Sequence, residues 1–372
     1  MIYYDNAATT SLLPEVRDAM IDTIDQYYGN PSSIHRPGRE ARVLIEEARK
    51  QIAHQFNITP AELFFMSSAT EAIATVLNSC LRDLTIKNII TSKLEHPAVS
   101  RNLALLQKVH HFNIHYVAHD AYGHISMEDL EQQTMQHPEA LVVLMHANNE
   151  TGTLLPLKKV KNICTNAGAL FLCDTVQTIG KFFINLDEGP DFATCSAHKL
   201  YGPKGVGFLY KRNNIDIKPL IEGGKQERTM RSGTENIYGI TGMKTAIEIA
   251  CKDNETVNKQ ISSLRTGLIN GLTFIIPEAR IIGSTQHTLG NIINMAFPLD
   301  IAGDMLQQRL DMNGVAVSGG SACSSGTNEK SDVAKALGVR DNEINIRFSL
   351  GRLNTAEELD RFLEIFAKTI AK

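Results

Sequence analysis

Short apolar runs alternate with segments of helical periodicity along the first two thirds of the chain. Runs of this length are typical of buried strands when turn residues bound them. We interpret six of them as strands: Leu63–Met66, Asn88–Thr91, Ala140–Met145, Ala169–Cys173, Phe192–Ser196 and Val206–Tyr210. Helical patterns follow at Glu71–Leu81, Pro97–Val109, Met127–Met135 and Leu157–Ala167. This alternation predicts an α/β fold with a mainly parallel sheet covered by helices on both faces.

The pattern changes after Asn236, where one long helical stretch runs from near Ile237 to near Leu272. Shorter strand-like runs and helices follow it. They are Arg280–Ile282, Ile292–Phe297, a helix near Ala302–Met312, Val315–Ser318, Asn345–Leu350 and a last helix after Thr355. We therefore predict a large domain over residues 15–250. A smaller C-terminal α/β domain would comprise residues 251–372 together with 1–14.

Composition and charge exclude several classes of protein. The 372 residues are 43% hydrophobic and 21% charged, with a net charge of −4, which fits a globular protein and argues against direct nucleic-acid binding. No apolar run reaches the ~18 residues of a membrane span, and the N-terminal residues Met1–Asn6 have neither the cationic start nor the apolar core of a signal peptide. We therefore expect a cytoplasmic protein without a membrane partner. Six cysteines without a Cys-x-x-Cys pair make a disulfide framework or a structural zinc site unlikely.

The candidate chemistry lies directly after the apolar runs, where ligands bind in open α/β sheets. Asp174 ends one run, and Ser196-Ala197-His198-Lys199 ends the next. His146-Ala147-Asn148-Asn149-Glu150 and Ser67-Ser68-Ala69-Thr70-Glu71 end two more. Parallel strands would bring all four ends to one edge of the sheet.

Taken singly, each of these residues also has an ordinary structural interpretation. Asp174 could cap a helix, and Lys199 could be a solvated surface lysine. Ser68 and Thr70 could cap the next helix, with Glu71 in its favoured first turn.

Taken together, the same residues compose a site for pyridoxal 5'-phosphate. A lysine can form a Schiff base with the cofactor's aldehyde, a carboxylate can pair with its ring nitrogen, and a helix N-terminus can bind its phosphate. The absence of Gly-x-Gly-x-x-Gly and of a Gly-rich Lys-Ser/Thr loop disfavours dinucleotides and nucleoside triphosphates.

The motifs closely resemble those of the cysteine desulfurase family over essentially the whole chain. The lysine motif is Ser196-Ala197-His198-Lys199 with Tyr201-Gly202-Pro203-Lys204-Gly205. The other matching segments, in the family's order, are Asp5–Thr10, Gly29–Ser33, Glu95-His96, His146–Gly152, Met230–Thr234, Ser318–Gly326 and Asn345–Arg352. The resemblance implies the type I fold of pyridoxal phosphate enzymes, within the class V aminotransferase group.

It also implies a role for each matching residue. Lys199 would carry the cofactor, His96 would stack on its ring and handle protons, and Cys323 would be the nucleophile. Asp174 would pair with the ring nitrogen, Gln177 with the ring hydroxyl, and Thr234 with the phosphate of the partner subunit's cofactor. The remaining cofactor contacts would be Ala69, Thr70, Asn149, Ser196 and His198. Asn149 and Arg347 would hold the substrate, with Arg347 on its α-carboxylate.

Cys323 stands apart from the other cysteines because only Gly, Ser and Ala flank it. Such a loop gives a thiol reach and no apolar cover, whereas Cys173 and Cys195 lie in apolar runs and read as buried hydrophobes. The resemblance implies that Cys323 takes sulfur from L-cysteine as a persulfide. It is also our one candidate ligand for a transient iron–sulfur cluster.

The expected activity is therefore conversion of L-cysteine to L-alanine by a homodimer that passes sulfur to a protein acceptor, such as an iron–sulfur scaffold or a thiolation enzyme. An aminotransferase and a selenocysteine lyase remain as alternative enzymes, and a sulfur carrier without turnover as an alternative from another class. One departure from the family is Ser68, where glycine is usual.

Overall fold

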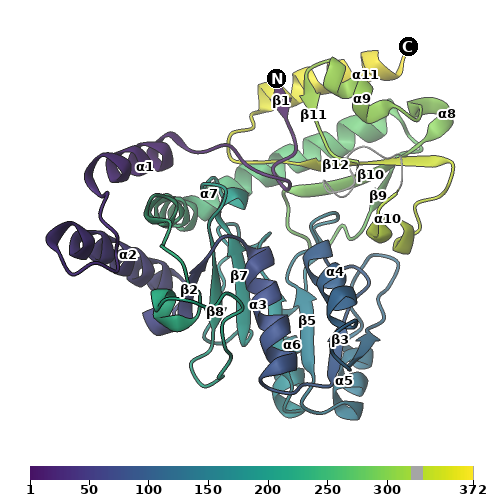
Figure 1. Ribbon diagram of the computed structural model, residues 1–372. Coiled ribbons are helices and arrows are strands. Elements are labelled where there is room, and N and C mark those ends of the chain that lie inside the picture. Colours follow the sequence, from purple (N-terminus) through teal and green to yellow (C-terminus); the bar gives the residue numbers. More distant parts are fainter. Residues whose placement is uncertain (320–329, 372) are drawn as a thin grey trace.

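The computed structural model describes residues 1–319 and 330–371, and its centre is a seven-stranded sheet (Figure 1). The strand order is β2-β8-β7-β6-β5-β3-β4, in which β8 is antiparallel to both neighbours and the other pairs are parallel. The strands are β2 (Leu63–Met66), β3 (Asn88–Thr91), β4 (Asn113–Tyr116), β5 (Leu141–Met145), β6 (Leu170–Asp174), β7 (Phe192–Ser196) and β8 (Gly207–Lys211). The predicted mainly parallel sheet is confirmed, and β4 is a strand that the pattern did not predict.

Helices cover both faces of this sheet, as predicted. On one face α3 (Ala69–Arg82) and α4 (Pro97–Leu106) pack on side chains such as Phe64 and Val143. The other face carries the helices α1 (Pro14–Gln26), α2 (Arg36–Gln55), α5 (Met127–Gln136), α6 (Leu157–Asn166) and the first half of α7 (Ile237–Ile275). Alternate residues of each strand point to opposite faces, so a strand such as β2 contributes to both cores.

The C-terminal part forms a second core around a three-stranded antiparallel sheet of order β12-β10-β9. Its elements are β9 (Arg280–Ile282), β10 (Ile292–Pro298), α8 (Leu299–Ala302), α9 (Leu306–Met312), β11 (Val315–Ala316), α10 (Asp332–Ala336), β12 (Glu343–Ser349) and α11 (Ala356–Ile370). The helix predicted near Ala302–Met312 is two helices, because Gly303 adopts φ +76° between them.

Helix α7 belongs to both cores. Its first half packs on α1 and α2, and its second half contributes Leu264 and Leu268 to the C-terminal core. The predicted division at residue 250 therefore falls inside one continuous helix, and it stays a prediction. No helix within residues 1–319 and 330–371 is long and apolar enough to cross a membrane.

The N-terminal segment crosses between the two parts (Figure 1). Strand β1 (Ile2–Tyr3) pairs in parallel with β11 of the C-terminal part. A few residues later, the backbone N–H of Thr10 donates to the carbonyl of His198, which follows β7 of the large sheet. Residues 5–10 therefore lie against both sheets.

Candidate active site

The four predicted strand ends lie on one edge of the large sheet. The register pairs Met145 with Asp174 and Asp174 with Thr194. Gly207 of β8 lies opposite both Ser196 of β7 and Met66 of β2. Because β8 alone is reversed in this sheet, β2 points the same way as β7, and its end joins the others.

Lys199 ends the short helix η2 (Ala197–Lys199), which directly follows β7. Its ammonium group donates to the backbone carbonyls of Ala7 and Ala8, each at 2.7 Å. The N-terminal segment thus fixes the amine at the sheet edge, half-buried and within the cluster formed by the strand ends. The role of Lys199 as a Schiff-base lysine stays a prediction.

Asp174 and His96 lie near Lys199 and influence each other's charge. Asp174 is 9% exposed, and burial raises its pKa, while the amide of Val176, His96 and Lys199 lower it in part. Burial lowers the pKa of His96, and the negative charge of Asp174 opposes this shift. His96 caps α4 by accepting a bond from the Ala98 N–H at its Nδ1 (3.0 Å), so Nε2 carries the proton of the neutral ring.

The residues predicted to bind the phosphate lie at and beside the N-terminus of α3 (Ala69–Arg82). The Ser196 hydroxyl of β7 accepts from the Ala69 N–H at 2.8 Å, and the Ser68 hydroxyl accepts from the Glu71 N–H at 3.3 Å. The N–H of Thr70, between them, has no acceptor in the described residues, and Thr70 is exposed. A free N–H, two hydroxyls and the positive end of a helix dipole suit a phosphate. Ser68, in place of the usual glycine, serves as the helix cap.

Two further predicted cofactor contacts converge on the same segment. His198 Nδ1 lies 3.1 Å from the Thr9 hydroxyl, and burial, with Lys199 nearby, lowers its pKa to about 4. Gln177 donates from Nε2 to the Ala7 carbonyl at 3.0 Å, so it shares this acceptor with Lys199. The donor set as a whole fits pyridoxal phosphate: an amine, a carboxylate, an imidazole and a helix N-terminus surround one sheet edge.

Arg347 reaches this edge from β12 of the C-terminal part. Its guanidinium is 1% exposed and donates to the Asn149 backbone carbonyl and to the Asp5 carboxylate, each at 2.9 Å. The two predicted substrate residues, Asn149 and Arg347, are therefore in direct contact.

One of the predicted residues, Thr234, is not brought into this cluster. Thr234 is exposed on the loop before α7. Cys323 lies outside the described residues, so its role stays a prediction. The buried cysteines Cys173 and Cys195 are fully enclosed in strands, as predicted. Within residues 1–319 and 330–371, no group of His, Cys, Asp and Glu side chains is arranged to hold a metal ion.

Sequence reasoning assigned no role to three charged residues that border the site. Asp5 pairs with Arg347, and Glu95 is 7% exposed with its Oε1 accepting from the Met145 N–H at 3.0 Å. Lys181 donates to the Gln177 carbonyl at 3.1 Å, and burial lowers its pKa to about 7. Asp5 and Glu95 stand inside the matching motifs, which was the signal available for finding them.

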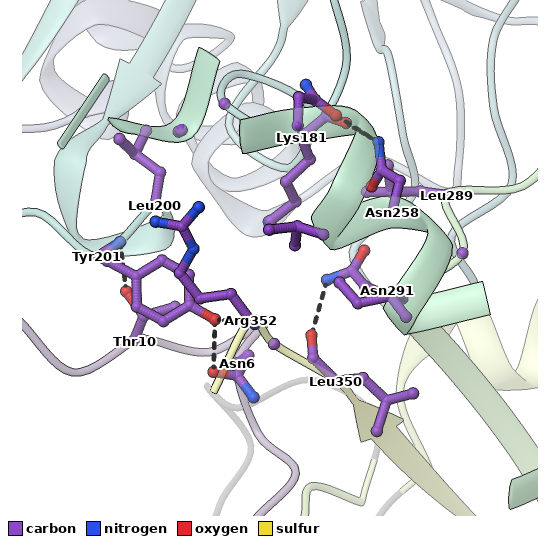
Figure 2. A pocket seen from close by; sticks show the side chains of 17 residues that line it. Asn6, Thr10, Lys181, Leu200, Tyr201, Asn258, Leu289, Asn291, Leu350 and Arg352 are labelled. Atoms are coloured by element: carbon purple, nitrogen blue, oxygen red, sulfur yellow. Dashed lines mark hydrogen bonds between the residues drawn. The ribbon is translucent and has the colours of Figure 1, made fainter. Parts of the chain in front are cut away.

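A small cavity of about 40 Å³ lies beside the segment that follows Lys199 (Figure 2). Lys181 and Asn258 border it on one side, where the Asn258 amide donates to the Lys181 carbonyl at 3.0 Å. Tyr201 and Arg352 border the other side. At ~15 Å³ per water molecule, the cavity has room for water and none for a cofactor.

Comparison with known proteins identifies close relatives over the whole chain. The sequence model of the family "Aminotransferase class-V" matches residues 2–362. The chain is 40% identical to the cysteine desulfurase IscS of Dictyoglomus turgidum, over 100% of this chain and 95% of that protein. Among solved structures, a NifS-like protein superposes with a TM-score of 0.92 at 37% identity and covers 100% and 99% of the two chains. A NifS-like protein from Rickettsia africae superposes with a TM-score of 0.90 at 31% identity, over 100% of both chains.

His146, which follows β5, predicts a pH dependence of stability. Burial lowers its folded pKa to about 4, whereas an unfolded imidazole titrates near ~6.5. Between these values only the unfolded chain takes up the proton, so the free energy of unfolding falls as the pH falls. His146→Phe keeps a ring beside Phe182 but has no group that titrates. Between pH 7 and pH 5, the free energy of unfolding of the variant should therefore fall by about 2 kcal/mol less than that of the wild type. Urea unfolding at the two pH values measures this difference.

The control is His54→Gln, at an exposed position near the end of α2. Its stability should change with pH as the wild type's does. If His146→Phe also loses stability as the wild type does, then His146 is not the group whose protonation is suppressed by folding.

Proposed function

The chain belongs to the cysteine desulfurases of the class-V aminotransferase family, and on that premise we propose that it converts L-cysteine to L-alanine and transfers the sulfur. The observation that supports this most is the meeting of Lys199, Asp174 and His96 at one sheet edge beside the open N-terminus of α3. We propose that this cluster holds pyridoxal 5'-phosphate, whose aldehyde bonds to an amine and whose ring accepts electrons from Cα.

Each residue then has a distinct task. Lys199 supplies the amine, and the carbonyls of Ala7 and Ala8 hold it in place. Asp174 keeps a proton on the ring nitrogen. Because its carboxylate is buried, its negative charge stabilises the positive charge of the protonated ring strongly. His96 moves protons, since the low pKa of its buried ring leaves it neutral at pH 7.

Substrate binding depends on the C-terminal part. Arg347 takes the α-carboxylate of L-cysteine, for which a planar guanidinium is the preferred partner. Asn149 sits beside it through the 2.9 Å bond from Arg347 to its carbonyl. The Cys323 thiolate would then bond to the substrate sulfur while the bond between that sulfur and Cβ breaks. The electron pair of the broken bond goes to Cβ, which takes up a proton and becomes the methyl group of L-alanine. We infer that the persulfide on Cys323 passes to a thiol of a protein acceptor, such as an iron–sulfur scaffold or a thiolation enzyme.

We also propose a homodimer whose interface contains Thr234. Exposed apolar side chains gather on the segment between α1 and α2, including Tyr28 (79% exposed) and Ile34 (90% exposed). Gln226 joins this segment to the Thr234 loop, because it donates to the Ser32 hydroxyl at 3.3 Å and accepts from the Gly233 N–H at 3.2 Å. An exposed apolar patch beside a predicted phosphate ligand favours contact with a second copy.

Reduction with borohydride tests the Lys199 assignment. A hydride traps the bond between cofactor and lysine, so peptide mapping should find the pyridoxyl group on Lys199. Lys199→Ala should abolish release of sulfide and alanine, because it removes the amine that we propose holds the cofactor. Lys204→Ala, at an exposed lysine in the same motif, should retain turnover. A label on Lys204 would contradict the assignment.

Cys323→Ser tests the reaction itself. The variant should keep the visible absorption of the bound cofactor and bind L-cysteine, yet form no persulfide and release no sulfide, because a hydroxyl cannot carry sulfur. The matched control is Cys251→Ser, at a partly exposed cysteine of α7, which should behave as the wild type does. Alanine formation at the wild-type rate in Cys323→Ser would exclude attack by this thiol. Transamination without sulfide release in the wild type would identify an aminotransferase instead.

The dimer is tested by light scattering on the purified protein, which should report twice the mass of one chain. Ile34→Glu should shift the protein towards monomer, because it buries a charge in the apolar patch. Phe274→Glu, at an equally exposed apolar residue near the end of α7, should leave the dimer intact. A wild-type protein that is monomeric at all concentrations would rule out the proposal.

A further inference from the structure

Arg347 is held by acceptors from two other segments. Its side chain is 1% exposed, and two of its three nitrogens donate to Asp5 Oδ1 and to the Asn149 carbonyl at 2.9 Å. The third, Nε, is buried and has no acceptor within residues 1–319 and 330–371. A buried guanidinium with an unmet N–H is prepared for one more acceptor.

Asp5 is itself fixed in place. Its backbone forms a β-bridge with Ser349 at the end of β12, and the next residue, Asn6, donates its N–H to the Ser349 carbonyl at 3.2 Å. The Ser318 hydroxyl donates to the same Asp5 Oδ1 at 2.7 Å. The carboxylate oxygen that receives Arg347 therefore has a position set by three segments that are distant in the sequence.

Asp5 also supplies the counter-charge of Arg347. Glu150 is a second acid near Arg347. Its Oε2 accepts from the Ser331 hydroxyl at 2.5 Å, and burial raises its pKa although Arg347 lowers it in part. Asp5 is 18% exposed at its side chain and keeps direct contact with the guanidinium. A buried arginine without such a partner would bear an uncompensated charge.

We propose that Asp5 is a positioning residue for substrate recognition: it holds Arg347 in one orientation, so that the remaining N–H groups face the α-carboxylate of the amino-acid substrate. The proposal rests on the proposed function. An arginine side chain has many rotamers, and fixing it before the substrate arrives removes an entropic cost from binding. Asp5 acts only through Arg347, so its loss should weaken recognition of the carboxylate and leave the chemistry at Lys199 in place.

The alternative is that Asp5 only ties the N-terminal segment to β12. The two roles differ in which ligands they affect. A structural defect would weaken every ligand, whereas a misplaced Arg347 should weaken only ligands that carry the free carboxylate. L-cysteine and its methyl ester differ in that one group, and L-alanine provides a carboxylate ligand without sulfur.

The experiment compares Asp5→Ala and Asp5→Asn with the wild-type holoenzyme. Asp5→Ala should raise the KM for L-cysteine and the Kd for L-alanine by about 10- to 100-fold, the range expected for a lost charge-assisted hydrogen bond. The Kd is measured from the change that L-alanine causes in the visible spectrum of the bound cofactor. The KM for the methyl ester should change less than about 2-fold on the same grounds. Asp5→Asn keeps an acceptor oxygen, so its loss should be smaller and in the same direction.

The matched control is Asp253→Asn. Asp253 pairs at 3.6 Å with Arg352, the other arginine of the same C-terminal motif, and its variant should bind both substrates as the wild type does. Equal losses for L-cysteine and its ester, or a wild-type Kd for L-alanine in both Asp5 variants, would overturn the proposal. If Asp5→Ala does not fold, Asp5→Asn decides by the same comparison. If the wild type makes no alanine, the proposed function fails, and the L-alanine titration still tests Asp5.

Discussion

The hydrogen bonds of the N-terminal segment, residues 5–10, hold the active-site cluster together. The carbonyls of Ala7 and Ala8 receive the Lys199 ammonium from the large sheet, and Asp5 receives Arg347 from the small one. Thr10 continues the attachment through the His198 carbonyl. One short segment is therefore bonded both to Lys199, beside the large sheet, and to Arg347, on the small sheet, and it helps to set the distance between them.

Burial gives this cluster its electrostatic character. Burial shifts the pKa values of Asp174, His96 and His198 towards the neutral form of each group. The Val176 amide and nearby cations oppose this shift at Asp174, and Asp174 opposes it at His96, whereas the lysines around His198 reinforce it. A positive charge placed beside Asp174 would lower its pKa, because opposite charges at close range in a water-poor site stabilise each other strongly.

The predicted site residues come from two separate cores of the fold. Asp174 and Lys199 follow β6 and β7, which are hydrogen-bonded on both sides, whereas Arg347 lies on β12 of a separate core. Helix α7 connects the two cores without interruption, so the parts are joined both by this helix and by the N-terminal segment. An enzyme that must bind one molecule between two cores gains precision from having two such connections.

The sequence by itself determined the succession of strands and helices along the chain, the mainly parallel character of the sheet and the residues at its edge. These follow from apolar periodicity and from polar residues at strand ends, which are local properties of the sequence. Lys199, Asp174 and the α3 N-terminus followed from them, and the motifs identified the family. The tertiary structure decided the rest. The split of α8 from α9, the strand β4 and the pairing of Asp5 with Arg347 depend on a glycine's φ, on exposed positions with weak patterns, and on contacts between residues over three hundred positions apart. Such contacts leave no periodic trace in the sequence, since only the folded backbone brings them within bonding distance.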